Sequence, residues 1–94
     1  MSYIHGKTLI KIAVADDHTM LREALSRLIN TWDNCKVIVE AESGQKLIDR
    51  IDSKNLPDLI VVDLGMPGMN GYETIAALKK LYPSLKFLVI SIYQ

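Results

Sequence analysis

The chain alternates between nearly continuous apolar runs and segments in which apolar residues recur every three or four positions. Runs of β-prone residues occupy positions 9–15, 59–62 and 86–91, and a partly alternating run occupies positions 36–41. Runs of this length, bounded by turn residues, are typical of strands, and strands that are apolar throughout are typical of a parallel sheet covered on both faces. The pattern therefore predicts four strands, with 36–41 at an edge of the sheet.

Three segments between the strands have the periodicity or the end signals of amphipathic helices. Residues 44–52 follow Ser43, whose hydroxyl can cap a helix, and a third helix starts after Asn70 and is stopped by Pro83. Residues 19–32 place five apolar side chains on one helix face: Leu21, Ala24, Leu25, Leu28 and Ile29. Strands that alternate with helices imply right-handed βαβ units around a parallel sheet, so the predicted fold class is α/β.

Carboxylates stand at the ends of two predicted strands. Asp16 and Asp17 follow the first strand, and Asp63 follows the third. Because the carboxyl ends of parallel strands meet at one edge, where α/β sheets bind ligands, we expect these carboxylates to converge. Such a group would raise the pKa of its members unless a cation lay among them, and oxygen donors favour Mg²⁺. A carboxylate beside Mg²⁺ can also accept a phosphoryl group.

Each of these residues also has an ordinary structural explanation. Asp16 and Asp17 are common turn and cap residues, and Asp63 can simply end a strand. Ser91, at the end of the fourth strand, can donate a hydrogen bond to a phosphoryl oxygen or be only a polar strand end. His18 is expected to be a residue of the helix N-terminus rather than a ligand, because no second histidine is near it in the sequence. Chance explains any one of these carboxylates more easily than it explains three of them at the ends of two neighbouring strands.

Composition narrows the class of protein. The chain has 94 residues, 49% of them hydrophobic, which suits one globular domain. Eleven Lys and Arg balance eleven Asp and Glu, and this argues against a nucleic-acid surface because phosphate binding needs a basic face. The single cysteine, Cys35, cannot form a disulfide within the chain, and neither a signal peptide nor a membrane span is found. We expect a cytoplasmic protein in which residues 1–8 form a short leader.

Three separated motifs carry a resemblance to a known family. They are VADDHTMLREAL, DLIVVDLGMPGMNGYE and FLVIS. Together they resemble the receiver domain of two-component response regulators over about residues 9–93. The DDH start, with Arg22 in the first helix, is most similar to the NarL/FixJ (LuxR-type) transcriptional regulators. The resemblance implies a flavodoxin-like (CheY-like) three-layer α/β/α fold with a parallel sheet in the strand order 2-1-3-4-5.

The resemblance also implies roles for the acidic residues. Asp63 would be the phosphoacceptor of a phosphoprotein, and Mg²⁺ would be the cofactor. Asp17 would be a direct ligand of the Mg²⁺ ion, and Asp16 would bind it through water. The backbone carbonyl of Gly65 would complete the protein's share of the metal shell.

Further residues would contact the phosphoryl group or shape the site around it. Ser91 would hydrogen-bond to the phosphoryl group and follow it during the conformational switch. Gly65 and Tyr93 would tune access to the acyl phosphate, and Pro67 and Gly71 would shape the loop beside it. Compared with the family, this sequence has no Lys after Ser91, no fifth strand, no last helices and no output domain. We interpret it as a single receiver domain shortened after its fourth strand.

The missing strand has a physical consequence. In the family's strand order, the strand over 87–91 becomes an open apolar edge of the sheet. Open apolar edges pair readily with another copy of a chain, so we expect a homodimer or an oligomer that exchanges elements.

Three functions are consistent with these residues. The first is a phosphorelay signalling domain, not an enzyme, that accepts a phosphoryl group from a sensor histidine kinase on Asp63. It would control transcription through a DNA-binding output domain that this segment lacks, without itself touching nucleic acid or membrane. The second is a phosphorylation-incompetent receiver that acts only as a dimerisation or binding module. The third is a Mg²⁺-dependent phosphatase with an Asp nucleophile, although Leu64 and Gly65 follow Asp63 where such enzymes carry a second Asp.

Overall fold

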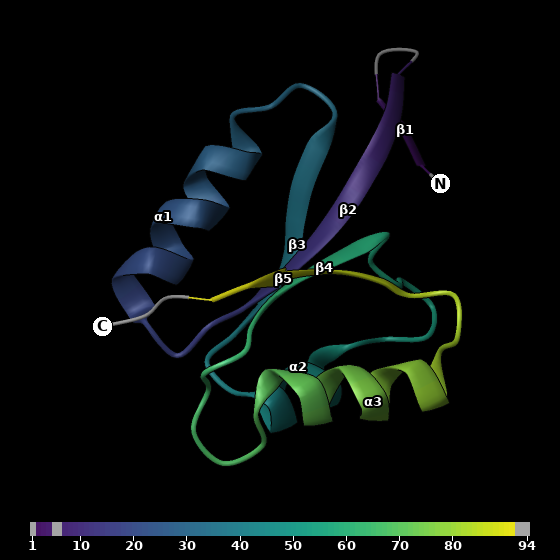
Figure 1. Ribbon diagram of the computed structural model, residues 1–94. Coiled ribbons are helices and arrows are strands. Elements are labelled where there is room, and N and C mark those ends of the chain that lie inside the picture. Colours follow the sequence, from purple (N-terminus) through teal and green to yellow (C-terminus); the bar gives the residue numbers. More distant parts are fainter. Residues whose placement is uncertain (1, 5–6, 92–94) are drawn as a thin grey trace.

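The computed structural model describes residues 2–4 and 7–91, and after two consecutive N-terminal strands its helices and strands alternate. The elements are β1 (Ser2–Ile4), β2 (Lys7–Ala15), α1 (Thr19–Asn30), β3 (Cys35–Ala41), α2 (Gly44–Arg50), β4 (Leu59–Asp63), α3 (Gly71–Leu81) and β5 (Lys86–Ile90) (Figure 1). Four strands run parallel in the order β3-β2-β4-β5. The predicted α/β class, the parallel sheet and the edge position of β3 are confirmed.

The N-terminal segment differs from the predicted leader. Strand β2 begins at Lys7, and β1 runs antiparallel to its first residues, with Ser2 opposite Leu9 and Ile4 opposite Lys7. A run of three residues is too short to show a period in the sequence, so only the pairing reveals the strand. Residues 2–4 therefore extend the sheet.

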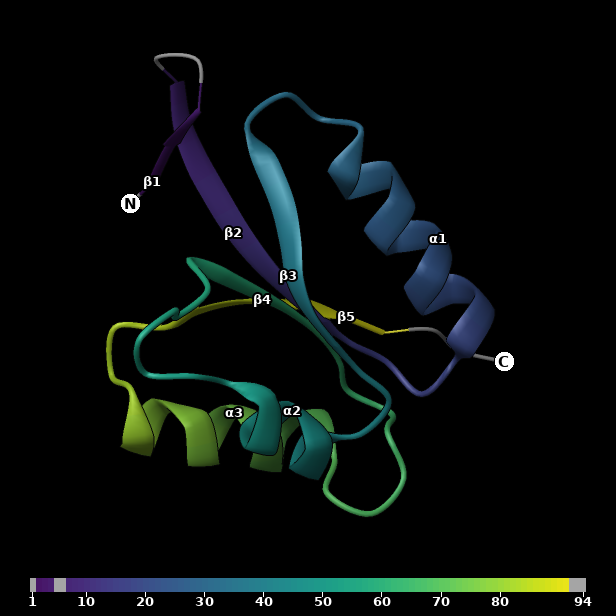
Figure 2. The ribbon, with the colours of Figure 1, turned by 180° about the vertical axis from the view of Figure 1, so that it is seen from behind.

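The helices divide the core into two parts. Figures 1 and 2 show α1 on one face of the sheet and α2 with α3 on the other. The side of α2 and α3 holds the larger cluster of buried residues: Ala13, Ala15, Ala41, Leu47, Ile51, Ile60, Val62, Met66, Leu78 and Leu85. The side of α1 holds a smaller buried cluster: Ile12, Val14, Ile29 and Val61. Alternate residues of β2 and β4 thus face opposite layers, as the pleat of a strand requires.

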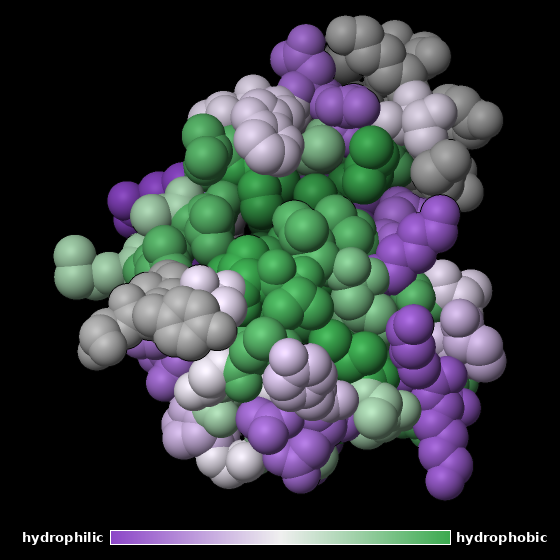
Figure 3. Space-filling model, viewed as in Figure 1, coloured by the Kyte–Doolittle hydropathy of each residue, from purple (hydrophilic) through white to green (hydrophobic). Residues whose placement is uncertain are grey.

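The face of the sheet on which α1 packs is only partly covered. Helix α1 contacts β2 and β3, and a helix about 10 Å across spans roughly two strands that lie about 4.8 Å apart. Part of the predicted apolar stripe is therefore exposed, since Leu28 is 53% exposed and Ala24 is exposed, whereas Ser26 is buried. On β5, Leu88 is 52% exposed. Figure 3 shows a broad hydrophobic surface in the middle of the face where Figure 1 places β5.

The predicted N-caps of α2 and α3 are confirmed, whereas α1 and α2 each end two residues before the predicted bounds, at Asn30 and Arg50. The Ser43 hydroxyl accepts a hydrogen bond from the Lys46 N–H at 3.2 Å. Asn70 and Glu73 form a reciprocal capping box, in which the Asn70 side chain accepts from the Glu73 N–H at 2.9 Å. The Glu73 carboxylate accepts from the Asn70 N–H at 3.2 Å. These caps satisfy N–H groups that the first turn of a helix leaves unpaired, and they set where α2 and α3 begin.

A charged cluster joins β3 to α2 and generates a pH prediction. The Glu42 carboxylate accepts hydrogen bonds from Lys46 and, at 3.2 Å, from Arg50, which also donates to the Glu40 carbonyl at 2.7 Å. The hydrogen bond from Lys46, with smaller contributions that include the charge of Arg50, lowers the pKa of Glu42 from 4.5 to about 2. Because the pKa of Glu42 is lowered, its interaction with Lys46 and Arg50 stabilises the fold fully above pH 4.5. This stabilisation is lost as the pH falls from 4.5 to about 2.

We expect Glu42→Gln to reduce the free energy of unfolding at neutral pH, and the difference from wild type to shrink between pH 4.5 and 2. The effect is small and weakens in salt, because the cluster is exposed. Urea unfolding of both proteins across this pH range measures it. A difference that stays constant with pH would contradict the assignment.

Candidate functional site

The carboxyl edge of the sheet gathers the acidic residues that follow β2 and β4. These two strands are neighbours, so Asp16, which follows β2, and Asp63, the last residue of β4, leave the sheet side by side. Among the described residues, one group of side chains could hold a metal ion, with ligand atoms all within 4.8 Å of one another: Asp16, Asp17, His18 and Asp63. The predicted convergence of the three carboxylates is confirmed.

Two of the three carboxylates are buried, and the group has unused acceptor atoms. Asp16 is fully buried, Asp63 is 2% exposed, and the Asp17 side chain is 32% exposed. The Gly65 N–H donates to Asp63 Oδ1 at 3.1 Å. Within the described part of the chain, Asp16 Oδ2 and Asp17 Oδ1 are buried and accept no hydrogen bond. Buried acceptors without donors are costly, and a bound cation is one way to satisfy them.

His18 belongs to this group, although the sequence placed it only at the helix N-terminus. It does precede the first turn of α1, and its N–H donates to Asp16 Oδ1 at 2.8 Å. Its ring Nδ1 lies 2.8 Å from Asp16 Oδ1, 3.4 Å from Asp17 Oδ1 and 3.8 Å from Asp63 Oδ2. The hydrogen bond to Asp16, followed by the charges of Asp16 and Asp17, raises the pKa of His18. The available signal in the sequence was the position of His18 directly after two strand-end carboxylates.

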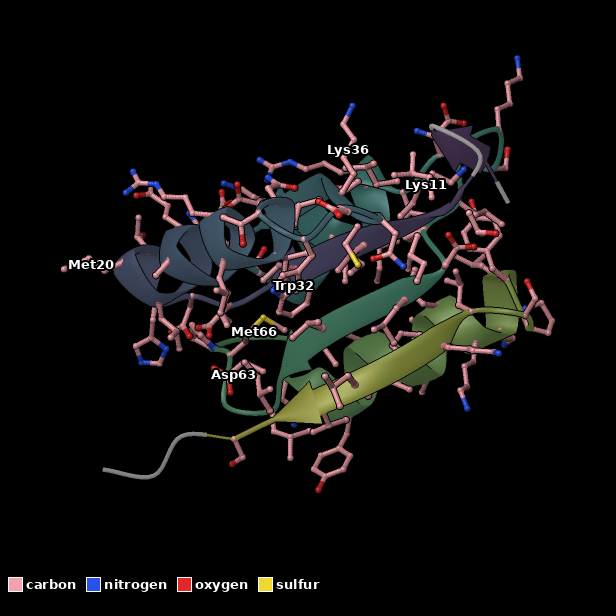
Figure 4. The ribbon with its side chains drawn as sticks, turned by 90° about the horizontal axis from the view of Figure 1, so that it is seen from above. Lys11, Met20, Trp32, Lys36, Asp63 and Met66 are labelled. Carbon is pink, nitrogen blue, oxygen red and sulfur yellow. The ribbon has the colours of Figure 1, made fainter. Side chains whose placement is uncertain are left out.

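Backbone contacts hold the turn between β2 and α1. The Asp16 N–H donates to the Ala41 carbonyl of β3 at 3.0 Å. The Arg22 guanidinium donates to the Asp16 carbonyl at 2.9 Å, and its Nε lies 3.4 Å from a Glu40 carboxylate oxygen. Arg22 thus anchors the residue that leads into the acidic cluster. In the view from above, Asp63 lies at the end of β4 on the same side of the molecule as Met20, at the start of α1 (Figure 4).

The loop after Asp63 is tied to both β5 and α3. The Leu64 N–H donates to the Ile90 carbonyl at 3.1 Å, and the Gly71 N–H donates to the Leu64 carbonyl at 3.2 Å. Met66 is buried beneath the loop and packs into the larger core cluster. The position of Asp63 therefore depends on the end of β5 and on the start of α3.

The other predicted site residues differ in how they are related to this cluster. Gly65 contacts Asp63 directly, and Gly71 is buried behind the Asp63 backbone. Pro67 is exposed on the loop. Ser91 is exposed and follows Ile90, the residue paired with Asp63, so it lies at the same edge of the sheet. Tyr93 lies outside the described residues.

Gly71 is placed where a side chain cannot fit. A Cβ atom there would lie 2.6 Å from the Asp63 carbonyl oxygen and 2.7 Å from Leu64 Cα, both of them backbone atoms. We expect Gly71→Ala to lower the free energy of unfolding by about 1–3 kcal/mol, as overpacking does, even though Ala is the better helix former. Chemical denaturation measures the loss.

Gly65→Ala is the matched control, because a Cβ atom there would lie at an ordinary 3.8 Å from Asp63 Oδ1. Its effect should stay within about 0.5 kcal/mol. Equal losses of stability in the two variants would contradict this explanation. Position 71 would then need glycine for a reason other than the close approach of the Asp63 and Leu64 backbone.

Comparison with known proteins agrees with this fold and site. Residues 12–94 match the family model of the response regulator receiver domain, and the chain belongs to that family of signalling domains. It is 41% identical over 81 residues to the nitrate/nitrite response regulator protein NarL of Escherichia coli (strain K12), and 34% identical over 85 residues to the transcriptional regulatory protein DegU of Brevibacillus brevis. These matches cover 86% and 90% of this chain, but 37% and 36% of the two relatives.

A solved structure supports the fold directly. The response regulator domain of Thermotoga maritima CheB superposes with a TM-score of 0.80 at 28% sequence identity. The match covers 88% of this chain and 60% of that one. The flavodoxin-like, CheY-like fold predicted from the sequence is confirmed, as is the relation to receiver domains of NarL and LuxR type.

Among the described residues, none of the helices is long and apolar enough to span a membrane.

Proposed function

We propose that this receiver domain accepts a phosphoryl group on Asp63 from a sensor histidine kinase, with Mg²⁺ as cofactor. The observation that carries this proposal is the meeting of three carboxylates, two of them buried, at one edge of the sheet, where Asp16 Oδ2 and Asp17 Oδ1 accept no hydrogen bond from the described residues. A set of carboxylate oxygens with unused acceptor capacity fits a hard divalent cation. Family membership supports the same function, because receiver domains work with histidine kinases.

We propose a role for each residue, following the resemblance to receiver domains. Asp17 and Asp63, with the Gly65 carbonyl, would hold the Mg²⁺ ion, and Asp16 would bind it through water. Bound there, the ion would neutralise charge on the transferred group. An oxygen of Asp63 attacks the phosphorus atom, a P–O bond forms, and the P–N bond of the phosphorylated kinase histidine breaks. The Gly65 N–H, at 3.1 Å from Asp63 Oδ1, orients the nucleophile.

Ser91 and β5 would carry the response. Ser91 would hydrogen-bond to the new phosphoryl group, which lies at the same edge of the sheet. The Leu64 N–H already joins the site loop to the Ile90 carbonyl, so a movement of Ser91 is passed to β5 and to the loop together. The chain matches only 36% of the length of DegU, the relative named a transcriptional regulatory protein. We propose that the receiver domain acts on transcription by controlling a DNA-binding output domain.

The proposal is tested with acetyl phosphate and Mg²⁺. We expect the wild-type chain to gain one phosphoryl group per molecule, read by intact mass, and to lose this reactivity when the metal is removed by EDTA. Asp63→Asn should abolish the product, because an amide cannot form the acyl phosphate.

Asp49→Asn is the matched control, since Asp49 is exposed and hydrogen-bonds Gln45 on α2, outside the acidic cluster. It should react as wild type does. Phosphorylation that persists in Asp63→Asn would disprove the assignment of the acceptor.

We further propose self-association through β5 as a second function of this segment. In the described part of the chain β5 pairs only with β4, so its outer edge presents unpaired backbone groups. Leu88 and Val89, in the middle of this strand, are 52% and 43% exposed. Pairing of β5 with β5 of a second copy satisfies the backbone groups and buries these side chains.

We expect Leu88→Lys to raise the dimer dissociation constant by about tenfold or more, because the two lysines would meet across the paired strands. Analytical ultracentrifugation measures this. Met20→Lys is the control, since Met20 is 86% exposed on α1, and it should leave the association unchanged. A wild-type chain that stays monomeric at tens of micromolar would rule out the pairing.

A further inference from the structure

The two edges of the parallel sheet differ in their backbone hydrogen bonds. Strand β3 lies at one edge and β5 at the other, and an edge strand has N–H and C=O groups that its single neighbour cannot pair. Such groups can pair with a strand of another molecule. On β3, however, three backbone groups are bonded to groups outside the sheet: the N–H of Cys35, the N–H of Val37 and the carbonyl of Glu40.

Side chains of two helices supply the bonds to Val37 and Glu40. The Val37 N–H donates to Oδ1 of Asn30, the last residue of α1, at 2.8 Å. The Glu40 carbonyl accepts from the guanidinium of Arg50, the last residue of α2, at 2.7 Å. Both helices contact β3, and they lie on opposite faces of the sheet (Figures 1 and 2). The outer edge of β3 is therefore held from both faces.

The course of β3 also opposes the addition of a further strand. Its pairing with β2 skips Ile38, because Ile12 pairs with Val37 and the next residue of β2 pairs with Val39. An extra residue of this kind bends an edge strand and interrupts the row of groups that a new strand needs. Lys36 is exposed and extends away from β3 (Figure 4), and lysine on an edge strand disfavours pairing.

Strand β5 lacks both the side-chain bonds and the extra residue. In the part of the chain that the structure describes, no side chain hydrogen-bonds to the backbone of β5, and its pairing with β4 runs from Lys86 to Ile90 without a shift. Leu88 and Val89, in the middle of the strand, are exposed and apolar. One edge of the sheet is thus closed by hydrogen bonds, and the other is open.

We propose that Asn30 and Arg50 block strand addition at the β3 edge, so that the chain assembles through β5 alone and stops at two copies. A chain with one open edge uses that edge up when two copies pair, whereas a chain with two open edges can add copies without end. The inference rests on the proposed self-association in one respect, that the open edge of β5 pairs with a second copy. It goes beyond it by assigning the residues that limit the assembly.

The test is analytical ultracentrifugation of the intact chain and of the double variant Asn30→Ala/Arg50→Met. Alanine suits the end of a helix and methionine keeps an apolar stem, so the variant loses the two side-chain bonds and little else. The wild-type chain should reach the mass of two copies and stop there. The double variant should exceed that mass, and its mass should keep rising with concentration.

Two single variants are the matched controls. Asn30→Asp keeps an acceptor for the Val37 N–H, and Lys46→Met removes a donor to Glu42 while it leaves the bond to the Glu40 carbonyl in place. Both should stop at two copies, as wild type does. Circular dichroism of each variant checks that the fold is retained.

The variant Leu88→Lys separates this inference from the β5 pairing. In that background, Asn30→Ala/Arg50→Met should lower the dissociation constant of the dimer by about tenfold or more, because two backbone groups of β3 become free to pair. If the double substitution changes the mass in neither background, the inference is overturned and a β5 dimer stands. A wild-type chain that grows beyond two copies also overturns it. A monomeric wild-type chain refutes the β5 pairing, and association gained by the double variant then supports the block at β3, whereas a monomeric double variant refutes it.

Discussion

The parallel pairing of β2 with β4 is the constraint on which the rest of this domain depends. Its register sets Ala15 opposite Val62, so both strands deliver their next residues to one edge of the sheet. Since strand side chains alternate between faces, a slip by one residue would turn Asp63 and its neighbours toward the wrong layer. Apolar side chains buried on both faces of β4 oppose such a slip, and the packing of the core thereby holds the carboxylates together.

The cost of bringing three carboxylates together is offset locally. Asp16 and Asp17 stand just before α1, where the positive end of the helix dipole favours negative charge. The ring and N–H of His18 and the N–H of Gly65 supply donors to two of the three residues. Acceptor capacity still remains, and this imbalance between acceptors and donors is the reason we propose a cation site at this edge of the sheet.

The two faces of the sheet differ in how completely they are covered. Helices α2 and α3 together bury a continuous cluster of ten residues, whereas α1 alone lies over β2 and β3. One helix cannot cover four strands, so apolar side chains such as Leu28 and Leu88 remain in contact with water. The exposed surface continues to the open edge of β5, the strand that the Leu64–Ile90 hydrogen bond connects to the site. The proposed chemistry at Asp63 and the proposed association at β5 would therefore share one element.

The sequence by itself determined the α/β class, the helix caps at Ser43 and Asn70 and the meeting of Asp16 with Asp63. Each of these depends on local chemistry or on the rule that parallel strands end at a common edge. The tertiary structure alone decided three other features: the pairing of β1, the half-covered stripe of α1, and the place of His18 in the acidic cluster. A three-residue strand is too short to show a period in the sequence. The burial of a helix face depends on the element that packs against it. The His18 ring joins the acidic cluster only because the turn after β2 orients it there.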